Sequence, residues 1–247
     1  MKRLTTYLNE KLVVNKNYNP YTCAPKSFAE LREIILDRYD KLGPGTKQNP
    51  IDFNDIDVSG MTTFYNESIN DGIFNGTNFE YINVSNWDVS NVESMSYMFS
   101  GCYKLKSIDI SNWDMSNVEN LSYMFYVCER LEYVGNLSNW NVSHVKDISG
   151  IFCECKNLKL VGDLSNWDVS RVENIGWMFK VCEQLESVGD LSNWDVSQVK
   201  NMKCMFFDCK QLKSVGDLSK WNVSKVKYMN YMFYDSAITN IPNWYKE

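Results

Sequence analysis

Long apolar runs are absent from this sequence: no stretch approaches the roughly 18 consecutive apolar residues that a membrane-spanning helix needs. A basic excess is absent too, because 25 Lys and Arg stand against 31 Asp and Glu, for a net charge of −6 and a pI near 5.0. Proteins that bind nucleic acid concentrate Lys and Arg against the phosphates. We therefore expect neither a membrane span nor a nucleic-acid partner.

An export signal is also missing, because residues 1–14 lack a continuous apolar region. This absence favours a cytoplasmic or virion-associated protein over one at the cell surface. Four apolar residues of this segment share one helical face: Leu4, Tyr7, Leu8 and Leu12. They predict a terminal amphipathic helix docked on the body. A detachable address peptide is the alternative, since the segment loosely resembles the N-terminal targeting segments of proteins packaged into tailed-phage heads.

A tandem repeat occupies most of the chain. Its most regular marker is a tryptophan that returns after one step of 26 residues and four steps of 27: Trp87, Trp113, Trp140, Trp167, Trp194 and Trp221. Self-similarity at such a period is typical of a solenoid, in which stacked coils bury a continuous core. We predict about seven coils, with the first and last atypical. An aromatic residue fixed in every coil indicates internal packing rather than a ligand-stacking platform.

Each repeat contains a first apolar segment after the tryptophan. Its apolar residues stand 5, 8, 11 and 12 positions after the Trp, as in Val92, Met95, Met98 and Phe99. This spacing places all four on one helical face, and Ser90 with Glu93 resembles a capping box that returns in two later repeats. We predict a short helix here, with a 3₁₀ or irregular turn as the alternative.

A second apolar segment follows in each repeat, with the pattern Leu-x-x-Ile-x-Ile at Leu105, Ile108 and Ile110. Alternation in its second half indicates a short strand with its apolar side chains in the core. Stacked coils then form a parallel sheet, with neighbouring strands about 4.8 Å apart.

The complete repeat runs N-W-D-V-S-N-V, then M-S-Y-M-F-S-G-C, then L-x-S-I-D-I. It closely resembles the BspA-like, Mycoplasma-type surface-protein repeat family known as DUF285, over about three quarters of the chain. The resemblance implies an α/β fold: a right-handed leucine-rich-repeat-like solenoid with a short parallel sheet and short helices or turns. It also implies adhesion or protein recognition, with no catalytic residues and no cofactor.

Two parts of the chain are expected: residues 1–50, with N-terminal helices and a linker, and the solenoid of residues 51–247. Within the first part, Ser27 as N-cap, Glu30 in a capping box and Gly43 as the stop predict a helix. Its apolar face carries Leu31, Ile34, Ile35, Tyr39 and Leu42. We expect this helix to cap the first coil, since an uncovered end would expose apolar core and an open strand edge.

The terminal repeats depart from the frame. A degenerate coil begins near Ile56, and its excess length over residues 66–71 predicts an insertion that bulges from the stack. The last repeat places Ser236 where the others have Cys.

Five of the eight cysteines form a column 15 residues after the Trp: Cys102, Cys128, Cys155, Cys182 and Cys209. They share a face with Phe and Leu, and a free Cys behaves as a small buried hydrophobe. We therefore expect buried, reduced thiols rather than a disulfide framework, and an accessible Cys23 in the linker.

Catalytic and metal-binding patterns are weak. His144 is the only histidine, in a slot that other repeats fill with Asn, Arg, Gln or Lys, so it indicates solvated surface; a catalytic pair with Cys153 or Cys155 is the alternative. A polar column four residues before each Trp comprises Asn83, Asp109, Asn136, Asp163, Asp190 and Asp217. It lacks the Gly-x-Asp repeat of calcium-binding rolls. We assign no catalytic residue and no metal ligand.

The strand segment supplies the candidate binding surface. Its charged column alternates in sign, which predicts opposite-charge pairs between neighbouring coils: Glu80, Lys106, Glu132, Lys159, Glu186 and Lys213. We predict a noncatalytic module that binds a protein or glycan through this face. The candidate residues are Tyr81, Lys106, Tyr133, Lys159, Leu160, Glu186 and Lys213. The alternative is a structural or virion-associated phage component whose contacts lie in residues 1–50. The identity of the partner and the oligomeric state stay open.

Overall fold

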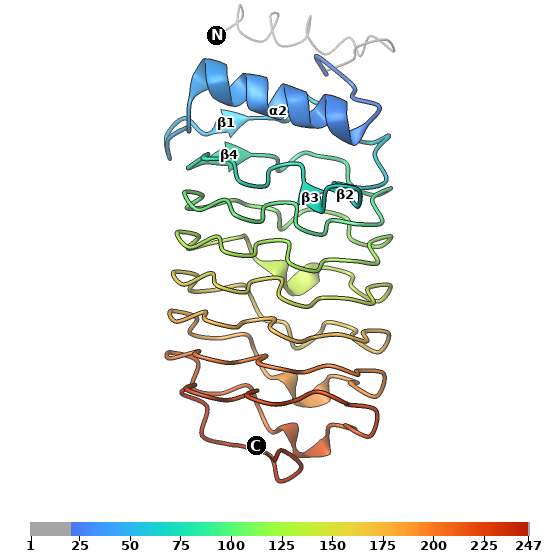
Figure 1. Cartoon of the computed structure of the whole chain (residues 1–247), viewed down its shortest axis with the longest axis vertical. Coiled ribbons are helices and arrows are strands. Elements are labelled where there is room, and N and C mark those ends of the chain that lie inside the picture. Colours follow the sequence, from blue (N-terminus) through green and yellow to red (C-terminus); the bar gives the residue numbers. More distant parts are fainter. Residues whose placement is uncertain (1–20, 247) are drawn as a thin grey trace, which may run out of the picture.

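The computed structural model describes residues 21–246. These residues form one elongated stack of coils, with the helix α2 (Phe28–Leu42) across one end and the C-terminal residues at the other (Figure 1). The predicted repeat solenoid is confirmed. The N-terminal amphipathic helix predicted within residues 1–14 lies outside the described residues, and the right-handed winding stays a prediction.

Stacked side chains from successive coils form the core. The six phenylalanines 12 residues after each Trp, together with Phe74, stack in one column with ring centroids 5.0 to 6.0 Å apart. Offset stacking at these separations adds to the stabilisation from burial alone. Each coil thus covers the apolar edge of the next, as the nearest-neighbour architecture of a repeat array requires.

Two ladders of parallel bridges join the coils. The leucine ladder runs along the Leu-x-x-Ile segment and links Tyr81, Ser107, Tyr133, Leu160 and Ser187. The turn ladder follows the Trp by seven residues and links Thr63, Ser94, Asn120, Asp147, Asn174, Asn201 and Tyr228. Within residues 21–246, β1 (Ile51–Asp52) and β4 (Ile82–Asn83) are the only strands that pair in parallel, so the predicted sheet is mostly a series of single bridges.

The predicted short helix after each tryptophan is wrong. Within residues 21–246 this segment is a run of turns that carries the turn ladder. Residues 10 and 14 positions after the Trp have positive φ, for example Trp177 at 58° and Val181 at 59°. A right-handed helix excludes such residues. The predicted inward positions are nevertheless correct, because Val92, Met95 and Phe99 are fully buried.

The predicted capping boxes are also wrong. The Ser90 hydroxyl donates to Asp88 Oδ1 at 2.6 Å, and the Ser90 N–H bonds to the same oxygen. This is an Asx turn, a local alternative to helix formation. Similar Asx turns stand on both sides of the tryptophan in most coils, which explains why Asp or Asn recurs two residues before Ser in the repeat. Three of the upstream turns are 3₁₀ helices: η1 (Leu137–Asn139), η2 (Leu191–Asn193) and η3 (Leu218–Lys220).

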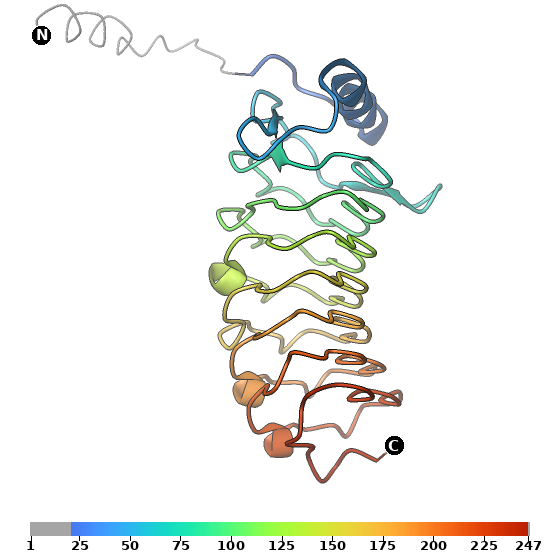
Figure 2. The same ribbon diagram turned by 90° about the vertical axis from the view of Figure 1, so that its left-hand side faces the viewer.

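The predicted insertion in the first coil is a β-hairpin. Here β2 (Tyr65–Asn66) pairs antiparallel with β3 (Asp71–Gly72). The hairpin projects sideways from the stack (Figure 2). Its excess residues therefore leave the core register of the coil unchanged, and Phe74 rejoins the phenylalanine column.

The predicted helix at residues 28–42 is confirmed. The Glu30 N–H donates to Ser27 Oγ at 3.2 Å, and the Gly43 N–H returns to the Tyr39 carbonyl. Leu31 and Ile35 are fully buried in the core that extends into the first coil. Leu42 is exposed, so the predicted apolar face is one residue too long.

Candidate recognition surface

The outward residues of the Leu-x-x-Ile segments form a strip, which the leucine ladder joins as far as Ser187. It is here called the leucine face: Glu80, Tyr81, Lys106, Ser107, Glu132, Tyr133, Lys159, Leu160, Glu186, Ser187, Lys213 and Ser214. In each coil two consecutive side chains point outward between an inward Leu or Phe and an inward Ile or Val. The seven predicted binding residues all lie on this face. The bridges along the ladder bring residues 26 or 27 positions apart in sequence side by side.

Charged residues of the leucine face are partly paired. Lys106 Nζ lies 2.6 Å from Glu80 Oε2, and Lys159 Nζ lies 3.5 Å from Glu132 Oε2. The hydrogen bond from Lys106 lowers the pKa of Glu80, and the same bond raises the pKa of Lys106. The predicted pairing is thus confirmed for two steps of the column. Pairs involving Glu186 and Lys213 are not seen among the described residues.

The centre of the leucine face is apolar. Tyr133 and Leu160 are bridge partners in adjacent coils, and 42% and 49% of their surfaces are exposed. Two bulky, partly exposed apolar side chains thus lie side by side on neighbouring coils. The flanking pair Glu132 and Lys159 gives this patch a polar border.

Other aromatic residues, which the sequence analysis missed, line the turn ladder. Tyr65, Tyr97 and Tyr123 stack with ring centroids 5.7 and 5.2 Å apart, and Tyr126 packs edge-on against Tyr123. Burial raises the pKa of Tyr123 to about 12. The recurrence of Tyr in the M-S-Y-M-F segment was the available signal. Because these rings are half-buried against each other, they present less free apolar surface than Tyr133 and Leu160.

The tryptophan column is buried, as predicted. The indole N–H of each repeat Trp, and of Trp244 at the end, donates to a backbone carbonyl of the preceding coil at 2.7 to 3.2 Å. A ring whose polar edge is bonded inside the core cannot serve as a ligand platform. The column therefore joins coils.

The cysteine column is buried as well, so this prediction is confirmed. Each thiol donates to the phenylalanine carbonyl of the preceding coil, as Cys155 Sγ does to Phe125 O at 3.0 Å. Desolvation raises the pKa of Cys155 and of the other four thiols in the column. Ser236, in the same slot of the last repeat, bonds instead to Phe233 of its own coil.

The polar side chains four residues before each Trp accept hydrogen bonds from backbone N–H groups. Asp163 Oδ1 accepts from the Ser165 N–H at 2.9 Å, and Asp190 Oδ1 accepts from the Ser192 N–H at 2.9 Å. The Ser192 contacts also lower the pKa of Asp190. Over residues 21–246, no group of three or more His, Cys, Asp or Glu is placed to hold a metal ion. Turn formation accounts for the column without a bound cation.

The Cys-His alternative lacks a reactive thiol. His144 is exposed, with Nδ1 3.3 Å from Ser143 Oγ, whereas Cys153 is buried. Burial raises the pKa of Cys153 to about 12, so the thiolate that nucleophilic catalysis requires is scarce near neutral pH.

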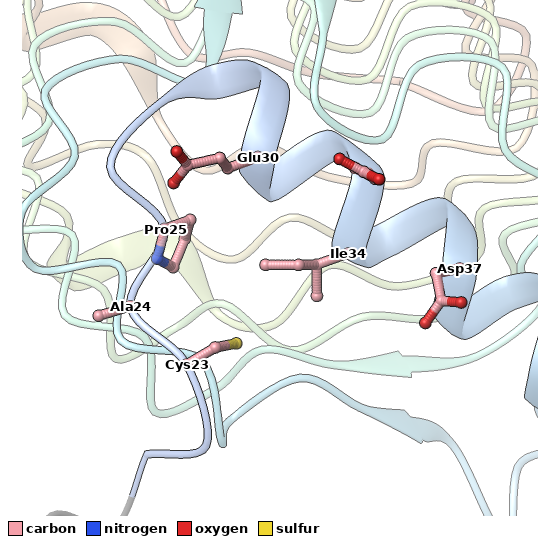
Figure 3. Close-up of a pocket in the computed structure, with 7 residues that line it drawn as sticks. Cys23, Ala24, Pro25, Glu30, Ile34 and Asp37 are labelled. Carbon is pink, nitrogen blue, oxygen red and sulfur yellow. The ribbon is translucent and has the colours of Figure 1, made fainter.

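A cavity of about 390 Å³ lies between the linker and α2. Cys23, Pro25, Glu30, Ile34 and Asp37 line it, and Figure 3 shows the Cys23 sulfur turned toward Ile34. Its carboxylates come from the exposed side of α2, and no cationic side chain lines it. Cys23 is half-buried here, less accessible than its place in a linker predicts.

Comparison with known proteins identifies the family. The family model described as "Mycoplasma protein of unknown function, DUF285" matches residues 47–160 and 131–244. The chain belongs to the DUF285 family. No curated protein matches it. Among the described residues no helix is both long and apolar enough to cross a bilayer.

Two solved leucine-rich repeat proteins resemble this DUF285 chain. One, from Eubacterium ventriosum, is 21% identical, with a TM-score of 0.47 over 76% of this chain and 44% of its own. The other, from T. pallidum, is 15% identical, with a TM-score of 0.22 over 49% of this chain and 60% of its own. The chain spans less than half the length of the first.

Proposed function

We propose that this DUF285 chain is a noncatalytic recognition module that binds a protein partner through the leucine face. The exposed pair Tyr133 and Leu160 is the observation that carries the proposal. Interfaces concentrate their binding energy in a few well-packed residues, among which Tyr is enriched, and surround them with polar groups. The border formed by Glu132 and Lys159 matches that arrangement.

The rigid backbone under Tyr133 and Leu160 also favours binding through the leucine face. Tyr133 and Leu160 stand on bridged segments between the fully buried pairs Leu131 and Val134, and Leu158 and Val161. A backbone fixed in this way needs little further ordering on binding. A repeat array offers such positions along its whole length, which suits an extended partner surface.

The helix α2 is proposed to act as the N-terminal cap of the solenoid. It buries Leu31 and Ile35 against the first coil, and Tyr39 packs edge-on against Phe79 with ring centroids 5.0 Å apart. This cover protects the apolar end of the stack from solvent and from edge-to-edge association.

The proposal is tested with a protein microarray and a glycan array, each probed with wild-type chain and with the Tyr133→Ala plus Leu160→Ala variant. We expect a protein signal that this variant loses. The matched control is Tyr103→Ala plus Leu36→Ala, which removes similarly exposed side chains outside the leucine face and should bind as wild type. Circular dichroism verifies that both variants stay folded.

Three other results would point elsewhere. Unchanged protein binding by the Tyr133→Ala plus Leu160→Ala variant contradicts the choice of face. A signal on glycans alone supports glycan-mediated adhesion. If binding is instead lost from a chain that begins at Ser27, the contacts lie in the N-terminal segment, as a structural or virion-associated component would require.

A further inference from the structure

Side chains on the outer face of α2 are open to solvent. Glu33, Leu36, Asp37 and Asp40 stand at i, i+3, i+4 and i+7, which places them on one side of the helix. This side lies opposite the one that α2 buries against the first coil, and 42% of the Leu36 surface is exposed. The outer face therefore combines acidic groups with an apolar residue near its centre.

A groove of about 540 Å³ lies between this face and the hairpin of β2 and β3. Figure 2 shows α2 and the projecting hairpin on the same side of the stack. Ile69, in the turn of the hairpin, is 62% exposed and lines the groove together with Leu36, Phe28 and Ala29. A segment that docks here removes the two bulky side chains Leu36 and Ile69 from water, and such burial is favourable.

The groove is acidic. Of the described residues that line it, Arg32 is the only cation, and its guanidinium already donates to the carbonyls of Ile73 and Asn75 at 2.6 and 2.8 Å. Three carboxylates line the same groove, so its net charge is −2: Glu33, Asp37 and Asp40.

Two of these carboxylates are available to a further cation. Asp37 Oδ2 lies 2.7 Å from Lys41 Nζ, whereas Glu33 and Asp40 form no ion pair within residues 21–246. Seven residues of helix separate Glu33 from Asp40, about 10 Å along the axis. One lysine side chain placed between them can therefore reach either carboxylate.

Residues 2–12 of the same chain have the complementary character, although they lie outside the described residues. They carry three cationic side chains and one carboxylate, a net charge of +2: Lys2, Arg3, Lys11 and Glu10. Lys11 follows Tyr7 by four positions and Leu8 by three, so on a helix it shares the face of the apolar residues. A cation on such a face is poorly matched to a purely apolar surface and well matched to a groove with unpaired carboxylates.

The chain between this segment and the described fold is long enough for the contact. Residues 13–20 join the segment to Tyr21, and eight extended residues span up to about 26 Å. Cys23 and Pro25 line the cavity on the adjacent side of α2, and a helix is about 10–12 Å across with its side chains. Residues 13–20 can therefore pass over α2 and bring residues 2–12 to the groove.

We propose that residues 2–12 dock as an amphipathic helix in this groove, where Lys11 binds between Glu33 and Asp40. Leucines of the segment cover Leu36 and Ile69, and burial of these side chains together with the ion pairs holds the segment in place. Neither the groove nor residues 2–12 include a residue of the leucine face. Docking of this segment and binding of a partner to the leucine face are therefore separate properties.

A zero-length carbodiimide cross-link tests the contact in the full chain, because it joins an amine only to a carboxylate that touches it. We expect mass spectrometry to find Lys11 joined to Glu33 or Asp40. A mixture of ¹⁵N-labelled and unlabelled chains shows whether the two residues belong to one molecule. Links between differently labelled chains, links from Lys11 to other carboxylates alone, or no link from Lys11 would contradict docking within the chain.

Amide hydrogen exchange tests the docking without a reagent. Residues 4–12 should exchange about tenfold slower or more in the wild type than in Lys11→Glu, because the variant sets a carboxylate against carboxylates. The triple variant Lys11→Glu, Glu33→Lys and Asp40→Lys should recover the protection, since it exchanges the charges across the same contact. Lys16→Glu is the matched control: it makes the same change of charge outside the segment and should exchange as wild type.

A second pair of variants tests the apolar part of the groove. Leu36→Asn should speed the exchange of residues 4–12, whereas Leu42→Asn, at an exposed leucine of the same helix outside the groove, should leave it unchanged. Both positions are exposed, so circular dichroism should show that each variant stays folded. Fast exchange of residues 4–12 in the wild type, or protection that Lys11→Glu and Leu36→Asn leave intact, would overturn the proposal.

Discussion

The indole N–H of Trp140 donates a hydrogen bond of 3.2 Å to the carbonyl of Ile110 in the preceding coil. Both partners are buried. The ring thus fills the core and at the same time bonds a carbonyl that water cannot reach. This double role explains why the repeat uses Trp rather than Phe at this position.

Replacement of Trp140 by Phe should therefore destabilise the array although an aromatic ring is retained. The change removes one hydrogen bond, which costs about 0.5–1.5 kcal/mol in free energy of unfolding in addition to any cavity, while the Ile110 carbonyl keeps its bond from the Trp113 N–H at 3.2 Å. Urea denaturation followed by circular dichroism measures the loss. Trp244→Phe is the matched control, because Trp244 donates the same kind of bond, to the Leu218 carbonyl, but its ring is only half-buried. Equal losses at the two sites would contradict this account.

A second prediction concerns Gly189, whose φ is +85°. A Cβ at this position would lie 1.9 Å from Asp163 Oδ1, the atom that accepts from the Ser165 N–H. Gly189→Ala should cost about 2 kcal/mol or more in free energy of unfolding, since it combines left-handed strain with displacement of that turn. Gly60→Ala, with nothing within 4 Å and no positive φ, should be nearly neutral.

A double-mutant cycle separates the two causes of the Gly189 effect. In an Asp163→Ala background the conflict with the carboxylate is gone and only the 3.2 Å contact with the Leu164 N is left, so Gly189→Ala should cost less than it does in the wild-type background. An identical cost in both backgrounds would mean that backbone strain alone sets the effect.

Burial of the repeat positions could be predicted from the sequence because it depends only on period. The Trp, Phe and Cys columns recur at 26 or 27 residues, and the residues at each slot are buried. The helix at residues 28–42 was predictable from its N-cap and its glycine stop. These features rest on side-chain chemistry that the sequence shows directly.

The backbone between Val92 and Phe99 could not be predicted in the same way. Its apolar spacing fits a helix and a run of turns equally well, since both bury positions 5, 8, 11 and 12 after the Trp. Left-handed residues decide between them, and they fall on Tyr97, Tyr123 and Trp177, residue types that rarely adopt positive φ. Gly150 occupies the same position of its repeat and is the only glycine there, so it was the one sign in the sequence of a positive φ.

For the surface as well, side-chain exposure could be predicted from the sequence, whereas backbone hydrogen bonding could not. Exposure of Tyr133 and Leu160 followed from their place between inward residues of the strand pattern. The hydrogen bonds that join one turn segment to the next did not, because the direction of a hydrogen bond depends on backbone geometry rather than on residue type. The hydrogen bond from Arg32 of α2 to the Ile73 carbonyl could not be predicted for the same reason.

A third prediction concerns thiol reactivity. The five thiols of the cysteine column should resist a thiol reagent in the native protein and react on unfolding, while Cys23 should react faster than any of them. The reagent cannot reach the buried thiols, and burial also raises their pKa, so little thiolate is present to react. Labelling followed by mass spectrometry, with and without denaturant, measures the order of reaction.

Substitutions at Cys155 extend the same prediction. Cys155→Ala should cost about 1 kcal/mol in free energy of unfolding as a small cavity, whereas Cys155→Asp buries a charge and should disrupt the surrounding coils. A nonreducing mass measurement that finds two or more disulfides in the column would contradict the expected reduced state. It would also favour the cell surface over the proposed cytoplasmic or virion-associated location.

The last prediction uses pH to measure how firmly α2 is held. Arg38 of α2 pairs with Asp55 of the first coil, with Nη2 to Oδ2 at 3.1 Å, and Thr22 Oγ1 donates to the same carboxylate. The hydrogen bond from Arg38 lowers the pKa of Asp55 below its ordinary value of 3.8. A lowered folded-state pKa stabilises the fold above the ordinary value, and this contribution is lost as the pH falls through the lowered one.

Asp55→Asn should therefore lower the midpoint of urea unfolding by a constant amount above about pH 5, and the difference from wild type should shrink as the pH falls below 3.8. Solvent exposure of the pair limits the size of the effect. Asp37→Asn is the matched control, because Asp37 pairs with Lys41 within α2 at an exposed site and makes no link to the first coil through that pair. If the Asp55→Asn difference persists unchanged in acid, the Arg38 contact does not hold α2 to the first coil through charge. The cap would then depend on the burial of Leu31 and Ile35 alone.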